Sequence, residues 1–270
     1  MSCRRVLHSL LLLGVATVLL GTTRAYSGVA PEGSTTHVRT AQRGEIYRGS
    51  IVVRNTGEQP ADIKVYQTDY VFTAEGRSEY GTPGELPRSN AKWLRLGQEQ
   101  VTVAPGKRVS MDYEVRVPDD ASLTGTYWSA IMIQPIVGME AAGKRGARAQ
   151  LRQVIRHAIQ VITEIGESGT GAIAFDNARL LLEDGTRWFA FDIGNVGERW
   201  LRTDVWLELR DSQGRPVGRF PGRRLRTFPG TSVRNRIDLS AVSPGRYLAL
   251  LVADGGRNDL FGTQLELDIR

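Results

Sequence analysis

Residues able to do acid–base or nucleophilic chemistry are few and scattered in this chain. Past residue 25 there are two histidines, His37 in a polar stretch and His157 in an apolar one. A hydrolytic triad needs a histidine held beside a nucleophile and a carboxylate, and neither histidine belongs to such a pattern. A structural role is favoured for both. We therefore predict no catalytic residues and expect that the protein is not an enzyme.

Metal and cofactor patterns are missing as well. The one cysteine is Cys3, in the N-terminal segment, so we expect no disulfide and no cysteine metal site in the mature protein. The loop Asp254–Asp259 has carboxylates that could wrap calcium, but it lacks EF-hand spacing, and a hairpin turn explains it more simply. Acidic pairs at 119–120 and 183–184 fit solvated turns. No cofactor and no metal are predicted.

The first 25 residues look like an export signal. Arg4 and Arg5 precede an apolar run at 10–20, and Thr23-Arg24-Ala25 places small residues before a cleavage point near Ala25. The apolar run is shorter than the roughly 20 residues of a membrane span, which favours cleavage over an uncleaved anchor. We expect a periplasmic or secreted protein with no membrane span in the mature chain.

The charge of the mature chain argues against nucleic acid as a ligand. The formal net charge is +6, from 35 basic and 29 acidic residues. Removing the three arginines of the signal segment leaves 32 basic against 29 acidic residues, a net charge of +3. The basic patch Lys144, Arg145 and Arg148 has no aromatic residues interleaved for base stacking. No nucleic acid partner is predicted.

Alternation with a period of two dominates the elements that carry these residues. Val109, Met111, Tyr113, Val115 and Val117 alternate with polar residues, as in a strand with one wet face. The stretch Leu201–Arg210 alternates likewise and places Trp206 on its polar side. Turn signals such as Asn-Thr-Gly and Pro-Gly separate these runs. Many short strands at this spacing indicate antiparallel sandwiches.

One order of motifs occurs twice. Asn55-Thr56-Gly57, Pro105-Gly106 and Gly125-Thr126-Tyr127 are followed by their counterparts Asn195-Val196-Gly197, Pro229-Gly230 and Gly245-Arg246-Tyr247. Both tyrosines sit where immunoglobulin-like folds carry a tyrosine corner, whose hydroxyl bonds back to loop backbone. The repeat predicts an all-β protein of two tandem immunoglobulin-like β-sandwich domains, 26–166 and 167–270, after a signal peptide, 1–25.

The end of the first domain has two possible structures. Residues 147–160 allow a basic amphipathic helix, because Leu151, Val154 and Ile155 follow helical spacing. Ile155, Ile159 and Val161 also alternate, and a strand is favoured because a sandwich needs its final strand here.

The run Arg88–Leu94, followed by Ala104-Pro105-Gly106, Val117-Pro118 and Gly125-Thr126-Tyr127, resembles two groups of bacterial exported proteins. These are the WxL-interacting proteins and the PapD-like periplasmic pilus chaperones, both with two immunoglobulin-like domains. The resemblance covers nearly all of the mature chain, but its motifs specify architecture better than activity. It implies a non-enzymatic protein whose partner is another exported or surface protein. The membrane helix and basic tail usual in WxL-interacting proteins are missing here.

The pilus-chaperone resemblance also implies a partner site. Such chaperones hold a subunit's terminal carboxylate with basic residues between the domains and use alternating apolar residues on the last strand of domain 1. The positional candidates for the basic residues are Arg39, Arg152 and Arg156. For the apolar residues they are Ile155, Ile159 and Val161, although filling the core of domain 1 is the slightly favoured role for these three. Trp206 adds an outward aromatic that suits a domain or partner contact.

These observations predict a chaperone-like or surface- and pilus-assembly protein that binds its partner by β-strand addition. The alternative is a structural or adhesive cell-envelope module that binds polysaccharide or host protein. Neither reading specifies the oligomeric state.

Overall fold

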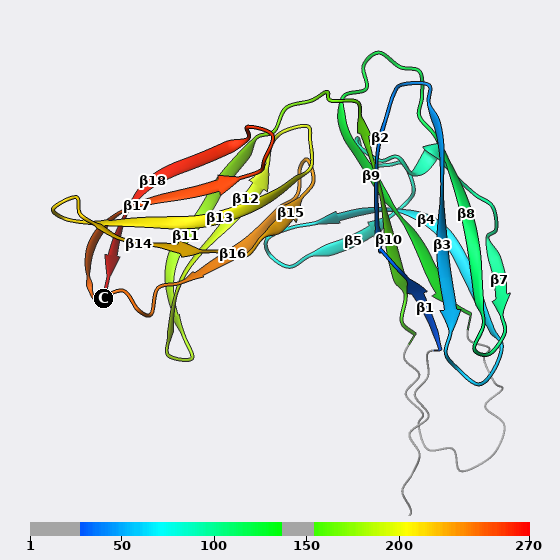
Figure 1. The fold of residues 1–270 in the computed structure, drawn as a ribbon, viewed down its shortest axis with the longest axis horizontal. Coiled ribbons are helices and arrows are strands. Elements are labelled where there is room, and N and C mark those ends of the chain that lie inside the picture. Colours follow the sequence, from blue (N-terminus) through cyan, green and yellow to red (C-terminus); the bar gives the residue numbers. More distant parts are fainter. Residues whose placement is uncertain (1–27, 137–153) are drawn as a thin grey trace, which may run out of the picture.

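The computed structural model describes residues 28–136 and 154–270 of the chain. Over these residues the protein is built almost wholly of β-strands (Figure 1). The predicted signal peptide lies outside the described residues. Within the described part, no helix has the length and apolar character needed to cross a lipid bilayer.

The first sandwich packs a four-stranded sheet, in the order β1-β3-β8-β6, against a sheet in the order β2-β10-β9-β4-β5 with β7 beside β4. A single 3-10 turn, Ala91–Trp93, precedes β6. The strands are β1 Val29–Glu32, β2 Thr36–Ala41, β3 Ile46–Asn55, β4 Ala61–Phe72, β5 Ser78–Gly81, β6 Leu94–Leu96, β7 Gln100–Val103, β8 Arg108–Arg116, β9 Gly125–Pro135 and β10 His157–Ile165.

The second sandwich packs the sheet β11-β12-β16 against the sheet β14-β13-β17-β18, with β15 beside β13. Its strands are β11 Ile173–Glu183, β12 Thr186–Asn195, β13 Leu201–Asp211, β14 Pro216–Pro221, β15 Leu225–Thr227, β16 Ser232–Asp238, β17 Gly245–Asp254 and β18 Leu260–Ile269. The loop Asp254–Asp259 is the hairpin turn between β17 and β18, and the Asp259 carboxylate pairs with Arg199 at 2.6 Å.

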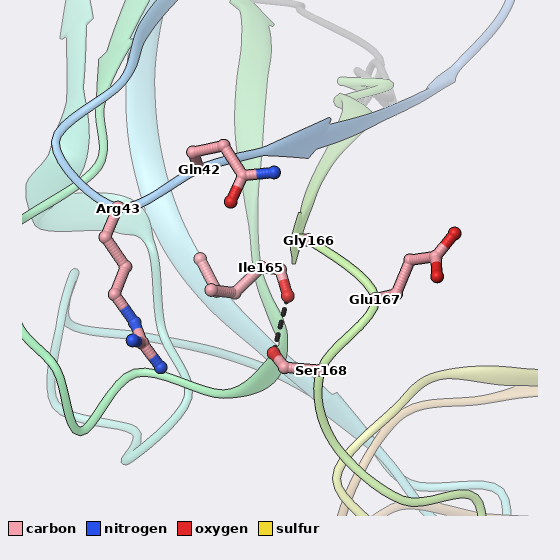
Figure 2. Close-up of a pocket in the computed structure, with 6 residues that line it drawn as sticks. All are labelled: Gln42, Arg43, Ile165, Gly166, Glu167 and Ser168. Atoms are coloured by element: carbon pink, nitrogen blue, oxygen red, sulfur yellow. Dashed lines mark hydrogen bonds between the residues drawn. The ribbon is translucent and has the colours of Figure 1, made fainter.

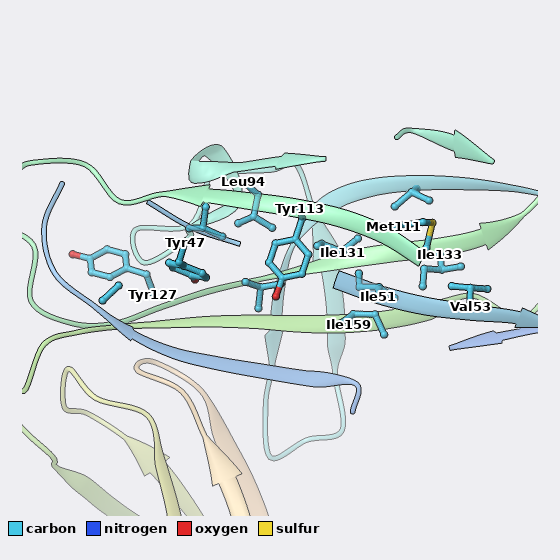
Figure 3. Packing of buried hydrophobic residues seen from close by; sticks show 14 of the residues in the cluster. Tyr47, Ile51, Val53, Leu94, Met111, Tyr113, Tyr127, Ile131, Ile133 and Ile159 are labelled. Carbon is cyan, nitrogen blue, oxygen red and sulfur yellow. The ribbon is translucent and has the colours of Figure 1, made fainter. Parts of the chain in front are cut away.

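Each sandwich has its own apolar core, made of the inward parity of its strands. The first core contains Ile51, Met111, Ile131 and Ile159, and Figure 3 shows these side chains packed together between the two sheets. The second core contains Phe189, Phe191 and Leu207. The strand prediction is therefore confirmed over 157–165. The competing interpretation was a helix over 147–160, of which residues 147–153 lie outside the described residues.

The repeated asparagines make the same bonds in both sandwiches, which explains the repeated motif. The Asn55 amide donates to the carbonyls of Gln59 at 2.7 Å and Val103 at 2.9 Å, and its Oδ1 accepts from the amide of Gly57. Asn195 donates to Arg199 and Thr227 at 2.8 and 3.2 Å, and accepts from Gly197. Each asparagine therefore connects its own turn to the segment just before the Pro-Gly turn, at Val103 in the first sandwich and at Thr227 in the second.

The two tyrosine corners differ. The Tyr247 hydroxyl donates to the Ser243 carbonyl at 2.7 Å, as predicted. Among the described residues, the Tyr127 hydroxyl has no hydrogen-bond partner. Its ring instead packs on Trp93 at 4.7 Å and lies 5.5 Å from the Arg88 guanidinium, so its role is packing.

The motif Arg88–Leu94 is explained by one buried side chain. Asn90 is fully buried, and its amide donates to the Val161 carbonyl at 3.1 Å and to the Thr163 hydroxyl at 2.9 Å. Its Oδ1 accepts from Ser129 of β9. Asn90 thereby joins the connection before β6 to both β9 and β10.

Candidate partner-binding site

The structure places two of the predicted partner-binding residues in the core. Ile159 and Val161 are 0% and 1% exposed. β10 lies between β9 and β2 and is covered on its inner face by the opposite sheet, so these side chains have no free surface. A docking role would need these two side chains exposed, so the structure favours the core-filling alternative for Ile159 and Val161.

Ile155 lies outside this core. Alternate residues of a strand share a face, so Ile155 and His157 lie on the same inward side of β10 as Ile159. Ile155 comes before His157, the first residue of β10 that pairs with β9. Ile155 is 42% exposed, and its neighbour Val154 is 39% exposed. Ile136, just after the end of β9, is 44% exposed. These three residues, which we call the apolar tip, lie at the end of the β9–β10 pair where the described residues stop.

The predicted basic residues have separate positions. Arg156 is exposed beside the apolar tip, and Arg152 lies outside the described residues. Arg39 lies on β2 and is 4.0 Å from Glu45 of the same sandwich. By alternation Arg39 shares a side of β2 with His37, which contacts Tyr113, whereas Thr36 on the opposite side contacts the second sandwich.

Trp206 lies on the outer face of β13, as its polar parity predicts, and is half-buried. The Arg219 guanidinium stacks 3.7 Å from its ring centroid, and its Nε1 donates to Glu208. These partners all belong to the second sandwich, so the described contacts give Trp206 no part in the interface between sandwiches.

Sequence reasoning missed Arg226, a cation that lies at the contact between the sandwiches. Arg226 of β15 donates to Gln160 Oε1 of β10 at 3.0 Å and lies 3.3 Å from Thr36 Oγ1 of β2. Arg202 is its cross-strand neighbour on β13. Burial, and then the charge of Arg202, lower the pKa of Arg226. No described carboxylate pairs with Arg226, so this cation is partly buried with neutral partners.

Residues 226–232 of the second sandwich continue across the outer face of the sheet that contains β10. Phe228 stacks on Trp128 of β9 with ring centroids 4.9 Å apart, next to Ile162 of β10. Ser232 accepts from the amide of Ala74, in the β4–β5 turn, at 2.9 Å. Figure 1 shows the β4–β5 hairpin reaching toward β15 and β16. The contact between sandwiches therefore extends from β2 to the β4–β5 turn.

The connection between the sandwiches is closely packed. A hollow of about 300 Å³ lies against the start of the connection and is lined by Gln42, Arg43 and residues 165–168. Figure 2 shows that Ser168 turns back to donate to the Ile165 carbonyl. The Thr126 amide donates to the Glu198 carbonyl at 2.8 Å, which joins the start of β9 to the second sandwich. The hollow holds no pair of groups suited to acid–base chemistry.

Comparison with protein-family models finds no match, and comparison with curated protein sequences finds none either. Among solved structures, the chain is similar to fimbrial chaperones. A chaperone–tip adhesin complex of CFA/I fimbriae gives a TM-score of 0.48 at 10% identity, over 90% of this chain and 100% of that chain. The class 5 fimbriae chaperone CfaA gives 0.44 at 12% identity, over 88% and 98% of the two chains.

A third similar structure is the CsuC–CsuE chaperone–tip adhesion subunit pre-assembly complex of Acinetobacter baumannii Csu pili. It gives a TM-score of 0.42 at 11% identity, over 88% of this chain and 96% of that chain. Identities of this size do not carry the roles of individual residues from those chaperones to this chain.

Proposed function

We propose that this protein is an exported, non-enzymatic chaperone of surface or pilus subunits that acts by β-strand addition. A partner segment would pair alongside the chain at the start of β10 and bury the apolar tip. Strand addition supplies affinity through main-chain hydrogen bonds and specificity through alternate side chains.

The observation that carries this proposal is the continuation of the β10 alternation beyond its own core. Ile159 and Val161 are buried by the first sandwich, but Ile155 continues the same series and remains 42% exposed. Val154 and Ile136 enlarge the exposed apolar surface there. An exposed apolar strand end is an aggregation hazard that proteins normally cover or blunt with charge, and Arg156 lies beside it. A partner that covers the apolar tip would remove this hazard.

The contact between the sandwiches supplies a second site of suitable chemistry. Arg226 and Arg202 are neighbours on β15 and β13, and the described structure gives Arg226 only neutral hydrogen-bond partners. A carboxylate of the partner would satisfy this cationic pair, since ionised hydrogen bonds between guanidinium and carboxylate are among the strongest. We assign this role to Arg226 in place of Arg39, whose side of β2 is the one that contacts Tyr113.

Trp206 is the outward aromatic residue that an adhesive module could use to bind a sugar. An exposed aromatic ring that stacks on a sugar needs a free face, and Arg219 already covers one face of this ring at 3.7 Å. The geometry therefore favours the chaperone-like function.

The test is co-purification of a partner from the exported fraction of the native host with the variant Ile155→Asp. Because Ile155 is exposed, we expect the variant to fold, with a free energy of unfolding within about 0.5 kcal/mol of wild type. Partner recovery should fall at least tenfold. Leu182→Asp is the matched control, because Leu182 is 75% exposed on the second sandwich, and it should retain the partner. Equal recovery with both variants would contradict the proposal.

A further inference from the structure

β2 is a short strand with little burial of its own. It has six residues and lies at the edge of its sheet, paired in parallel to β10 alone. Its first two residues are half-buried, the next three are exposed, and only the last residue, Ala41, is buried. Val38, in its middle, is 43% exposed. The apolar core therefore contributes little to holding β2 in place.

Side-chain hydrogen bonds hold β2 in place on both of its faces. On the core side, His37 Nδ1 lies 2.8 Å from the Tyr113 hydroxyl, and His37 Nε2 lies 3.1 Å from the Ser34 carbonyl. On the opposite side, the fastening comes from the second sandwich through Arg226.

Arg226 contacts the two strands at one rung of their ladder. Thr36 and Gln160 are direct partners in the β2–β10 register. The Arg226 Nη1 group lies 3.3 Å from Thr36 Oγ1 and 3.0 Å from Gln160 Oε1, so one guanidinium nitrogen bridges the pair. The guanidinium also lies 5.0 Å from the centre of the Trp200 ring, a further contact that holds it at the junction between the sandwiches.

We propose that Arg226 is a latch by which the second sandwich holds the edge strand β2 on β10. Loss of this contact would allow β2 to separate from β10 more often, starting at Thr36. The backbone edge of β10 would then open along residues that β2 now covers.

The latch has a consequence that rests on the proposed function. Gln160 and Thr36 both accept from Nη1 of Arg226, so an anionic group of a partner that takes the Nη1 donors would displace both of them. Capture of that group would therefore loosen β2 and lengthen the edge of β10 on which a partner strand can pair.

The latch is tested on the full mature chain without any partner, by hydrogen–deuterium exchange of peptides that cover β2 and β10. The Gln160 amide is a direct reporter, because it donates to the Thr35 carbonyl at 2.9 Å. In Arg226→Gln we expect these amides to exchange about tenfold faster, which matches the loss of one hydrogen bond from a charged donor. Exchange in β3 and β8 should stay at the wild-type rate.

Arg224→Gln is the matched control. Arg224 lies two residues earlier, and its described ion pair is with Asp204 of the second sandwich at 3.2 Å. The control should exchange like wild type. Equal rates in the two variants, or a uniform rise over every strand, would overturn the latch. The assay needs no partner, so the Ile155→Asp result bears on the proposed function alone.

Discussion

The two buried asparagines perform one structural task in each sandwich. Each is 1% exposed and donates to two carbonyls, one in a buried hydrogen bond and one in a half-buried hydrogen bond. In Asn195→Ala we expect the free energy of unfolding to fall by about 1–3 kcal/mol, because the buried Thr227 carbonyl and the half-buried Arg199 carbonyl lose their donor. Urea denaturation followed by tryptophan fluorescence measures this. Gln213→Ala, in an exposed turn, should change stability by less than about 0.5 kcal/mol.

The two corner tyrosines should respond differently to loss of the hydroxyl. Tyr247→Phe removes the bond to Ser243 and should cost about 1 kcal/mol. Tyr127→Phe keeps the packing on Trp93 and should cost much less. Thermal midpoints of the two variants check this, and an equal drop in both would contradict the assignment of a packing role to Tyr127.

Residue roles on β10 show where sequence reasoning reaches its limit. The alternation of Ile155, Ile159 and Val161 predicted which side chains share a face, and the structure confirms that shared face for Ile159 and Val161. Alternation is the same for a core face and a docking face, so exposure could not follow from it. Arg226 could not be predicted, because its partners are 66 and 190 residues away in sequence.

At the scale of elements, one ion pair joins the three strands of the sheet β11-β12-β16. Asp192 of β12 accepts from Arg234 of β16 at 2.7 Å and from Asn177 of β11 at 2.9 Å. The hydrogen bond from Arg234, followed by that from Asn177, lowers the pKa of Asp192 below its ordinary value of 3.8. The folded state therefore binds this proton less readily than the unfolded chain does.

This shift fixes the sign of a pH effect. The stabilisation by Asp192 is present above pH 3.8 and is lost as the pH falls through the lower folded-state pKa. Asp192→Asn should cost about 2 kcal/mol at pH 7. The difference in the free energy of unfolding between wild type and variant should shrink as the pH falls below 3.8, the ordinary pKa of an aspartate carboxyl. Urea midpoints from pH 7 to pH 2 measure it, and a difference that stays constant with pH would contradict this role.

Most of the strands could be predicted because alternation and turn residues act locally. Pro-Gly and Asn-x-Gly turns separate runs of period two, and the runs at 109–117 and 201–210 became β8 and β13. The switch of the chain from β1, which pairs with β3, to β2, which pairs with β10, has no such local signal. It depends on contacts between segments that are far apart in the chain.

For the whole molecule, close backbone contact sets how the sandwiches meet. Gly125 has a φ of +71°, and a Cβ there would overlap the Glu198 carbonyl oxygen of the second sandwich. Gly125→Ala should therefore both strain the backbone and push the sandwiches apart. Gly106→Ala is the matched control, because Gly106 has a φ of +68° and open space around it.

Spin labels on cysteines introduced at Lys107 and Ser212 report the distance between the sandwiches. Pulsed electron paramagnetic resonance should give a longer or broader distribution of the distance between the two labels for Gly125→Ala. The distribution for Gly106→Ala should match that of the parent protein. Identical distributions in the two variants would show that the Glu198 contact does not set the arrangement.

The repeated motifs predicted two sandwiches, because each copy carries the turns of a complete sandwich, and the sheet topology shows two. The contact between them was beyond sequence reasoning. It consists of the ring stack of Trp128 on Phe228 and of the hydrogen bonds that Arg226 and Ser232 make to the first sandwich. The turn motifs gave no sign of these contacts.

The most direct measurement of the proposed strand addition is photo-crosslinking from a benzoylphenylalanine introduced at position 155 in the native host. The same group at position 182, on the second sandwich, is the control. We predict that position 155 links to one exported protein, through an extended segment with alternating apolar residues, and that position 182 does not. No link from position 155, or the same links from both positions, would contradict partner binding at the end of β10.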